Sequence, residues 1–210
     1  MSKHTLTVLV ENRAAGRLLR FLTGAATAPA LQQKRSFLDG KIGAKVASER
    51  LTIVDDPLIP GALGSRLFDD EGIAARRFPV IEAGVLRNYY VDWYYGRKLG
   101  LDPTTGDSSN LVVAPGARTL AEIERTVERG ILVTSFLGGN SNGLTGDFSI
   151  GIQGVRLEKG ARVEAVGEMN LAGNHTGFWS RLAEVGADPW TYSPVRSPSL
   201  LFDGVSVAGS

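Results

Sequence analysis

Two β-rich flanks enclose a Glu-Lys-Gly turn in the stretch Gly154-Val155-Arg156-Leu157-Glu158-Lys159-Gly160-Ala161-Arg162-Val163. The same Glu-x-Gly pattern occurs earlier, in Pro79-Val80-Ile81-Glu82-Ala83-Gly84-Val85-Leu86. Glycine accepts positive φ because it has no Cβ, so a glycine turn between extended flanks is typical of a β-hairpin. The two stretches therefore predict that the domain contains antiparallel sheet.

The N-terminal segment predicts a strand followed directly by a helix. Residues 5–10 form the expected strand, and Asn12 can cap the helix that follows. The spacing of the next apolar residues keeps one face of that helix apolar: Ala14, Ala15, Leu18, Leu19 and Leu22. Beyond it we expect a partly helical basic segment at 32–38 and a short strand at 51–54.

Two more helices are expected in the C-terminal half. The run Thr119-Leu120-Ala121-Glu122 is a capping-box signature, and it predicts a helix that points Ile123 and Val127 inward and stops at Gly130, before a strand at 131–134. A last helix is predicted to carry Phe178, Trp179, Leu182 and Val185 and to end at Gly186. No repeat or linker interrupts the chain. We therefore predict a single α+β domain over residues 1–210, with a mixed, largely antiparallel sheet and packed helices.

Composition excludes several classes of function. The chain has 23 Lys and Arg residues and 22 Asp and Glu residues, which gives a net charge of +1. The two signs are interspersed along the chain, so no broad positive electrostatic field is expected to attract nucleic acid. No apolar run approaches the roughly 20 residues that cross a bilayer, and no signal peptide is evident, so a cytoplasmic protein without membrane contact is expected. The absence of cysteine excludes disulfides, thiolate zinc sites and a cysteine nucleophile.

Familiar catalytic motifs are also missing. The chain has neither a Gly-x-Ser-x-Gly elbow nor a phosphate loop, since the glycine-rich run at 138–143 lacks the lysine that such a loop needs. That run is expected to be a flexible turn. The two histidines, His4 in a frayed terminus and His175 in a loop, lie too far apart in sequence for a metal-ligand signature. We expect no catalytic residue, no bound metal and no cofactor in this chain.

Five stretches, taken in order, resemble one known family. They are Leu31-Gln32-Gln33-Lys34-Arg35-Ser36-Phe37-Leu38, Phe68-Asp69-Asp70-Glu71-Gly72, Gly96-Arg97-Lys98-Leu99-Gly100-Leu101, Thr145-Gly146-Asp147-Phe148-Ser149 and Leu171-Ala172-Gly173-Asn174. Together they are similar to the C-terminal domain of TldD/PmbA proteins, and the similarity spans nearly the whole chain. Family members carry an N-terminal domain ahead of this one. Its absence here is expected to reflect an excised domain, a split gene product or a reduced family member.

The resemblance also implies where metal chemistry would lie. TldD-like subunits bear a His-Glu-x-x-x-His motif on this first helix and a cysteine near the C-terminus, and together these hold zinc. The matching positions here are Asn12, Arg13 and Arg17, with Gly16 as the small residue between them. Arginine stays protonated and repels a dication. The chain therefore resembles the PmbA-like (TldE-like) kind, with a degenerate metal motif.

Two interpretations of these positions stay open. Asn12 can simply cap the helix while the arginines form a solvated face, or Arg13 and Arg17 can line the old cleft and bind an anion such as a peptide carboxylate. A further candidate lies in the family segment at 143–148. Gly143, Thr145, Asp147 and Phe148 are predicted to contact an extended peptide.

The resemblance implies a non-catalytic subunit, inactive alone, that binds peptide or acts as a scaffold beside a TldD-like zinc-bearing partner in proteolysis. The alternatives are a stand-alone binding or structural module and an independent peptidase with an unrecognised site. Self-association or association with another chain is also expected, because aromatic residues crowd the stretch at 89–95; the alternative is that these residues simply fill the core of the domain. Older family labels mention DNA gyrase, but the near-neutral charge gives no reason to expect contact with DNA.

Overall fold

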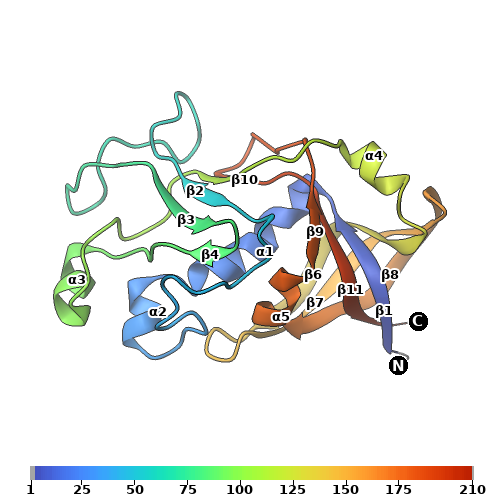
Figure 1. Ribbon diagram of the computed structural model, residues 1–210, viewed down its shortest axis with the longest axis horizontal. Coiled ribbons are helices and arrows are strands. Elements are labelled where there is room, and N and C mark those ends of the chain that lie inside the picture. Colours follow the sequence, from blue (N-terminus) through green and yellow to red (C-terminus); the bar gives the residue numbers. More distant parts are fainter. Residues whose placement is uncertain (1–2, 210) are drawn as a thin grey trace.

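A computed structural model describes residues 3–209, which form two sheets with helices between and around them (Figure 1). The helices are α1 (Asn12–Gly24), α2 (Ala28–Gln32), α3 (Trp93–Leu99), α4 (Leu120–Glu124) and α5 (His175–Ser180). The strands are β1 (Lys3–Val10), β2 (Ile53–Asp55), β3 (Phe78–Glu82), β4 (Val85–Leu86), β5 (Leu111–Val113), β6 (Arg129–Ser141), β7 (Asp147–Glu158), β8 (Ala161–Asn174), β9 (Leu182–Val185), β10 (Val195–Arg196) and β11 (Leu200–Ala208). The predicted α+β class with mixed, mostly antiparallel sheet is confirmed.

The larger sheet closes on itself. Its strand order is β1-β6-β7-β8-β11-β9, and an additional β1–β11 pairing joins the first strand to the last part of the chain. Only the β1–β6 pairing in this sheet is parallel. Figure 1 shows β1 and β11 side by side, so closure protects the backbone edges of strands that an open sheet would expose.

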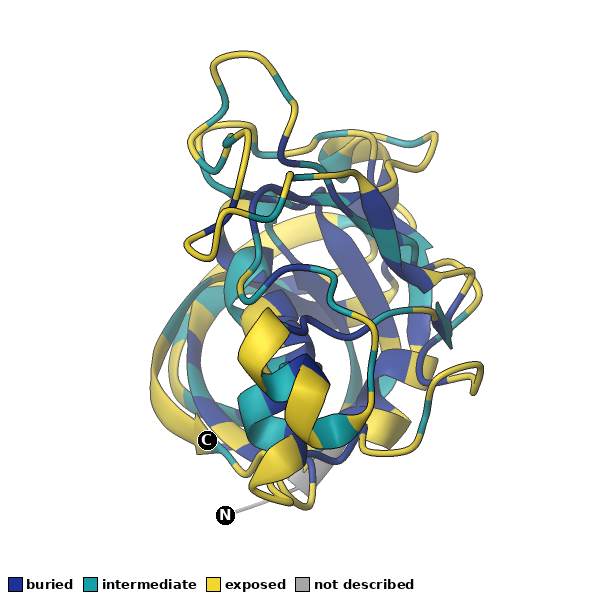
Figure 2. Cartoon of the chain, turned by 90° about the vertical axis from the view of Figure 1, so that its left-hand side faces the viewer, coloured by how far each residue is buried: buried dark blue, intermediate teal, exposed yellow. Residues whose placement is uncertain are grey.

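A smaller sheet, in the order β10-β5-β2-β3-β4, faces the other side of helix α1. Helix α1 contacts β6 of the closed sheet and β10 of the smaller one. Its apolar stripe, which includes Leu18, Leu19 and Leu22, is buried in a single core that both sheets share. Figure 2 shows the same division: buried residues lie on the strands and on the inner faces of helices, while the long loop at the top is largely exposed.

Both predicted hairpins are present. Strand β3 pairs antiparallel with β4, and β7 pairs antiparallel with β8. The turns take positive φ at two successive residues, Ala83 and Gly84 in one hairpin and Lys159 and Gly160 in the other. Two positive φ values match the right-handed twist of the flanking strands, which explains why the Glu-x-Gly pattern located these hairpins correctly.

Two helix boundaries differ from the sequence prediction. The residue before α1 is Glu11, and Asn12 is already the first helical residue, so its predicted capping role is wrong. Helix α4 has the predicted capping box between Thr119 and Glu122, but it ends at Glu124. The expected stop, Gly130, instead lies in β6, where a Cβ would meet the carbonyl oxygen of Thr7 at 2.4 Å.

The last predicted helix is also wrong in part. Helix α5 stops at Ser180, and residues 182–185 form strand β9, which pairs with β11. The spacing of Phe178, Trp179, Leu182 and Val185 suits a helix, and all four are buried. A pattern of buried residues does not by itself distinguish a helix from a short strand. Residues 182–185 are a strand because they pair with β11. In the part of the chain that the structure describes, no helix is long and apolar enough to span a bilayer.

The glycine run at 138–143 was expected to be a flexible turn, and this is wrong for residues 138–141, which belong to β6, whereas Gly143 lies in the turn that follows. Gly138 and Gly139 belong to β6, both with positive φ, at a register shift between Leu137 and Asn140. They form an irregularity within the β6–β7 pairing, of the kind that bends a strand and turns its end in a new direction. His4, expected in a frayed terminus, pairs with Val207 within β1.

Candidate functional site

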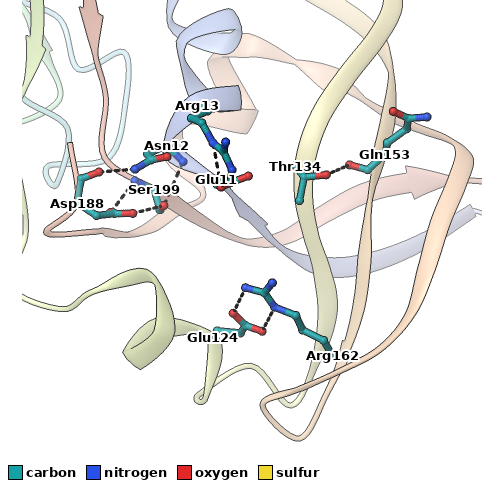
Figure 3. Close-up of polar contacts among 9 residues, drawn as sticks. All are labelled: Glu11, Asn12, Arg13, Glu124, Thr134, Gln153, Arg162, Asp188 and Ser199. Carbon is teal, nitrogen blue, oxygen red and sulfur yellow. Dashed lines mark hydrogen bonds and ion pairs between the residues drawn. The ribbon is translucent and has the colours of Figure 1, made fainter. Parts of the chain in front are cut away.

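Asn12 ties the start of helix α1 to a loop near the C-terminus (Figure 3). Its side-chain Nδ2 donates to the carbonyl oxygen of Asp188 at 2.7 Å, and its backbone N–H donates to Ser199 Oγ at 3.1 Å. The Asp188 carboxylate in turn accepts hydrogen bonds from Ser199 N and Ser199 Oγ, at 3.0 and 2.7 Å. These bonds close a network that holds the loop against the helix.

Arg13 and Arg17 on this helix both have partners within the chain. Arg13 pairs with Glu11 at 2.7 Å, and its guanidinium carbon lies 5.6 Å from the ring centroid of Trp190. Arg17 donates to the carbonyl oxygens of Phe136, at 3.3 Å, and Gly138 on β6. One guanidinium is therefore neutralised by a carboxylate, and the other supports the irregular end of β6.

The predicted peptide segment forms the turn between β6 and β7 together with the first two residues of β7, Asp147 and Phe148. Asp147 accepts hydrogen bonds from Thr145 Oγ1 at 2.8 Å and from Asn174 Nδ2 at 2.9 Å. The hydrogen bonds from Asn174 and Thr145 lower the pKa of the Asp147 carboxyl, so this group is ionised at neutral pH. The carbonyl oxygen of Gly143 accepts from Phe37 N at 2.8 Å.

Beneath this turn lies His175, which sequence reasoning treated as an ordinary loop residue. Its side chain has no exposed surface and stacks against Phe148 and Phe37, with ring centroids 4.7 and 5.4 Å away. Nε2 lies 2.9 Å from Ser141 Oγ, whereas Nδ1 has no hydrogen-bond partner among residues 3–209. Burial lowers the pKa of His175 to about 4, so the ring is neutral at physiological pH.

Strand β6 contacts both Arg17 and His175. Arg17 bonds to the carbonyl of Gly138, and three residues further along β6 the hydroxyl of Ser141 bonds to His175. The turn also borders a cavity of about 300 Å³, lined by Asn140, Ser141, Asn142, Asp147, Phe148 and Ser149. Of the predicted peptide residues, Asp147 and Phe148 line this cavity. The only sequence signal for His175 was its position next to Asn174, which ends one of the family stretches.

Comparison with known families assigns residues 3–209 to the family described as the PmbA/TldA metallopeptidase C-terminal domain. The chain belongs to this family. It is 30% identical to the metalloprotease PmbA of Escherichia coli O157:H7, over 96% of this chain and 45% of that protein. The chain therefore spans about half the length of the curated relatives that it matches.

Solved structures agree with the PmbA/TldA assignment. A Bacteroides thetaiotaomicron protein described as a "putative modulator of DNA gyrase" has a TM-score of 0.97 and 44% identity, over 100% of this chain and 48% of that one. The TldE protein of Thermococcus kodakarensis has a TM-score of 0.90 and 25% identity, over 100% of this chain and 51% of that one. Both likenesses confirm the fold, and the recognition of the family from five short stretches was correct.

The PmbA/TldA family implies zinc, but the residues at the matching positions do not fit it. Neither guanidinium offers a lone pair, and the Asn12 amide donates its hydrogens to a carbonyl. Positions 12 and 17 also lie about 140° apart around the regular helix α1. Among residues 3–209, no three His, Asp or Glu side chains are grouped so that they could hold a metal ion.

Proposed function

We propose that this chain is a non-catalytic subunit of a TldD/PmbA-type metallopeptidase complex, which binds peptide or acts as a scaffold beside a TldD-like partner that holds the zinc. The observation that carries the proposal is the set of internal contacts made by Asn12, Arg13 and Arg17. Zinc needs neutral or anionic donors with free lone pairs. Here the three side chains donate hydrogen bonds to Asp188, Glu11 and the end of β6.

The segment at 143–148, a turn followed by the start of β7, supports a role in holding peptide. Its backbone is fixed by bonds within the chain, including Asn142 N to Asp147 O at 2.7 Å and His175 N to Gly146 O at 2.8 Å. Exposed apolar side chains accompany it, since Leu144 is 57% and Leu137 47% exposed. A rigid turn with apolar side chains beside a polar cavity suits an extended peptide, which needs both hydrogen bonds and apolar contacts.

Reconstitution tests this proposal directly. The purified chain alone should hold no stoichiometric zinc and should cleave no peptide, whereas mixing it with a TldD-like zinc-bearing subunit should produce peptidase activity. Elemental analysis and a peptide-cleavage assay measure the two properties. About one zinc per chain, removed by chelation together with activity of the chain alone, would instead establish an independent peptidase. A natural complex without any zinc-bearing subunit would favour a stand-alone module.

Restoring the motif tests the alignment of α1 with the metal helix of the family. The triple variant Asn12→His, Arg13→Glu and Arg17→His introduces two imidazoles and a carboxylate and removes two positive charges. Zinc affinity measured by calorimetry should rise, while peptidase activity should not return, because the cysteine ligand is also missing. A folded triple variant with unchanged zinc affinity would mean that α1 does not provide the geometry of the family's metal helix. The single variant Arg20→Glu, on the same helix, controls for charge alone.

A further inference from the structure

The turn between β6 and β7 contains an asparagine that is followed directly by a glycine. Asn142-Gly143 is the single Asn-Gly pair in the sequence, and both residues are exposed. In such a pair the backbone nitrogen of the glycine can attack the side-chain amide of the asparagine, because glycine has no Cβ to shield that nitrogen or to restrict the backbone. The pair is therefore a candidate for a covalent modification that the chain performs on itself.

Hydrogen bonds hold the Asn142 amide over the peptide that follows it. Its Oδ1 accepts from Leu144 N at 2.9 Å and from Thr145 N at 3.3 Å. An attack on Asn142 Cγ places negative charge on this oxygen, and two N–H groups that already point at it stabilise that charge, as the donors of an oxyanion hole do. The turn therefore positions and polarises the amide before any reaction begins.

The attacking nitrogen is available as well. Among residues 3–209, the Gly143 N–H donates no hydrogen bond, whereas the Gly143 carbonyl oxygen accepts from Phe37 N at 2.8 Å. Gly143 is exposed, so solvent hydroxide can reach this N–H and remove its proton. Packing also requires glycine here, because a Cβ would lie 2.8 Å from the carbonyl oxygen of Arg35. The fold therefore keeps an unshielded nitrogen next to the Asn142 amide.

Asn140 offers a comparison within the same segment. It is exposed like Asn142, but it lies in β6 and pairs with Ser149 on β7. The residue after it is Ser141, whose hydroxyl lies 2.9 Å from His175 Nε2. A paired strand residue that precedes a residue with a side chain has neither the turn conformation nor the unshielded nitrogen. Exposure alone predicts equal reactivity of the two asparagines, whereas the geometry predicts reaction at Asn142.

We propose that Asn142 is a site of spontaneous deamidation, at which the turn converts to a succinimide and then to isoaspartate and aspartate. The Gly143 nitrogen forms a bond to Asn142 Cγ and loses its proton, while the bond from Cγ to Nδ2 breaks and Nδ2 leaves as ammonia. Water then opens the ring. Opening at the backbone carbonyl carbon gives isoaspartate, and opening at Cγ gives aspartate. Water is the only co-reactant.

Either product changes the cavity beside the turn. Of the residues that line this cavity, Asp147 alone is ionisable, and both products add a second carboxylate at position 142. Isoaspartate also lengthens the main chain by one atom, between the two backbone bonds that fix the turn. These are Asn142 N to Asp147 O at 2.7 Å and Gly146 N to Asn142 O at 2.8 Å. The modified chain therefore has a more negative cavity and a less firmly held turn.

Peptide mapping tests the modification. The purified chain is incubated at mildly alkaline pH and digested with trypsin, which releases residues 130–156 as one peptide that carries both asparagines. Fragmentation in the mass spectrometer locates the amide that has become a carboxylate, and an isoaspartyl methyltransferase measures isoaspartate. Asn142 should deamidate at least about tenfold faster than Asn140. The rate should rise with pH, because the Gly143 nitrogen must lose its proton.

Two variants and one peptide identify the cause. Asn142→Ser removes the reacting amide and should abolish isoaspartate formation, whereas Asn140→Ser, the matched control, should leave its rate unchanged. The acetylated and amidated peptide of residues 140–145 has the same sequence without the fold. The folded chain should deamidate at least as fast as this peptide, since the turn already holds the amide in place.

Three results would overturn the proposal. They are deamidation of Asn140 at the same rate as Asn142, an unchanged rate of isoaspartate formation in Asn142→Ser, and a folded chain that reacts more slowly than the peptide, which would mean that the turn protects the amide. None of these measurements involves zinc or peptide cleavage. Failure of this modification therefore leaves the proposed non-catalytic role untouched, and failure of that role leaves the modification untouched.

Discussion

Acidification should destabilise this domain through His175. Its pKa is about 4 in the folded chain and about 6.5 in an unfolded one, because burial between aromatic rings disfavours the charged form. Between these two values the unfolded state binds more protons than the folded state, so stability falls as pH falls. The stability linked to His175 is fully present above about pH 6.5 and is lost progressively down to about pH 4.

The size of this effect follows from the shift. Each pH unit between the two pKa values costs about 1.4 kcal/mol, and so the free energy of unfolding should drop by about 2 to 3 kcal/mol between pH 7 and pH 4.5. Urea unfolding at several pH values measures that free energy. The carboxylates add their own pH dependence to the measured curve, so a variant without this titration is needed.

His175→Phe provides that variant. A phenyl ring can stack against Phe37 and Phe148 but carries no proton, and it gives up the bond to Ser141. Its stability at pH 7 is expected to fall by about 1 kcal/mol, while the loss between pH 7 and pH 4.5 should shrink by about 2 to 3 kcal/mol relative to the unchanged chain. If both proteins lose the same stability over that range, the buried neutral imidazole is not the cause.

The remaining predictions concern strand packing and one ion pair. Gly154→Ala places a Cβ 1.9 Å from the carbonyl oxygen of Leu132 and should cost about 2 to 3 kcal/mol in urea unfolding, whereas Gly167→Ala, with nothing within 4 Å, should change stability by less than about 0.5 kcal/mol. Arg162→Met leaves the Glu124 carboxylate, which is only 10% exposed, without the guanidinium that donates two hydrogen bonds to it (Figure 3). The free energy of unfolding should fall by about 1 to 2 kcal/mol. Changing both residues to Met should recover part of that loss in a double-mutant cycle.

Local chemistry made part of this fold predictable. The two Glu-x-Gly turns and the Thr119 capping box depend on neighbouring residues only, and each was found where the sequence placed it. Strand β9 and the irregularity at Gly138 depend instead on strands distant in sequence. No local pattern reports that residues 182–185 pair with β11, or that β6 continues through two glycines. Sequence reasoning therefore failed where long-range pairing overrode the local pattern.

The candidate sites divide in the same way. The resemblance to a family located positions 12, 13 and 17, because it compares residues one by one. It could not report that Asn12 reaches Asp188 or that Arg17 reaches β6, since these partners lie more than 100 residues away. His175 was missed for a related reason: its burial depends on Phe37 and Phe148 folding around it from two other segments.

These long-range contacts bear on how the proposed match between α1 and the family's metal helix must be tested. Replacing Asn12 by His removes the donor to Asp188, and replacing Arg17 by His removes the donor to the Gly138 carbonyl. Each change therefore loosens the C-terminal loop or the end of β6 while it adds a zinc donor. The triple variant should therefore be less stable than the unchanged chain, so its zinc affinity is interpreted only after urea unfolding shows that it is fully folded. The separate variants Asn12→Ala and Arg17→Ala measure that loss of stability, because the two contacts lie on different segments and their costs should be nearly additive.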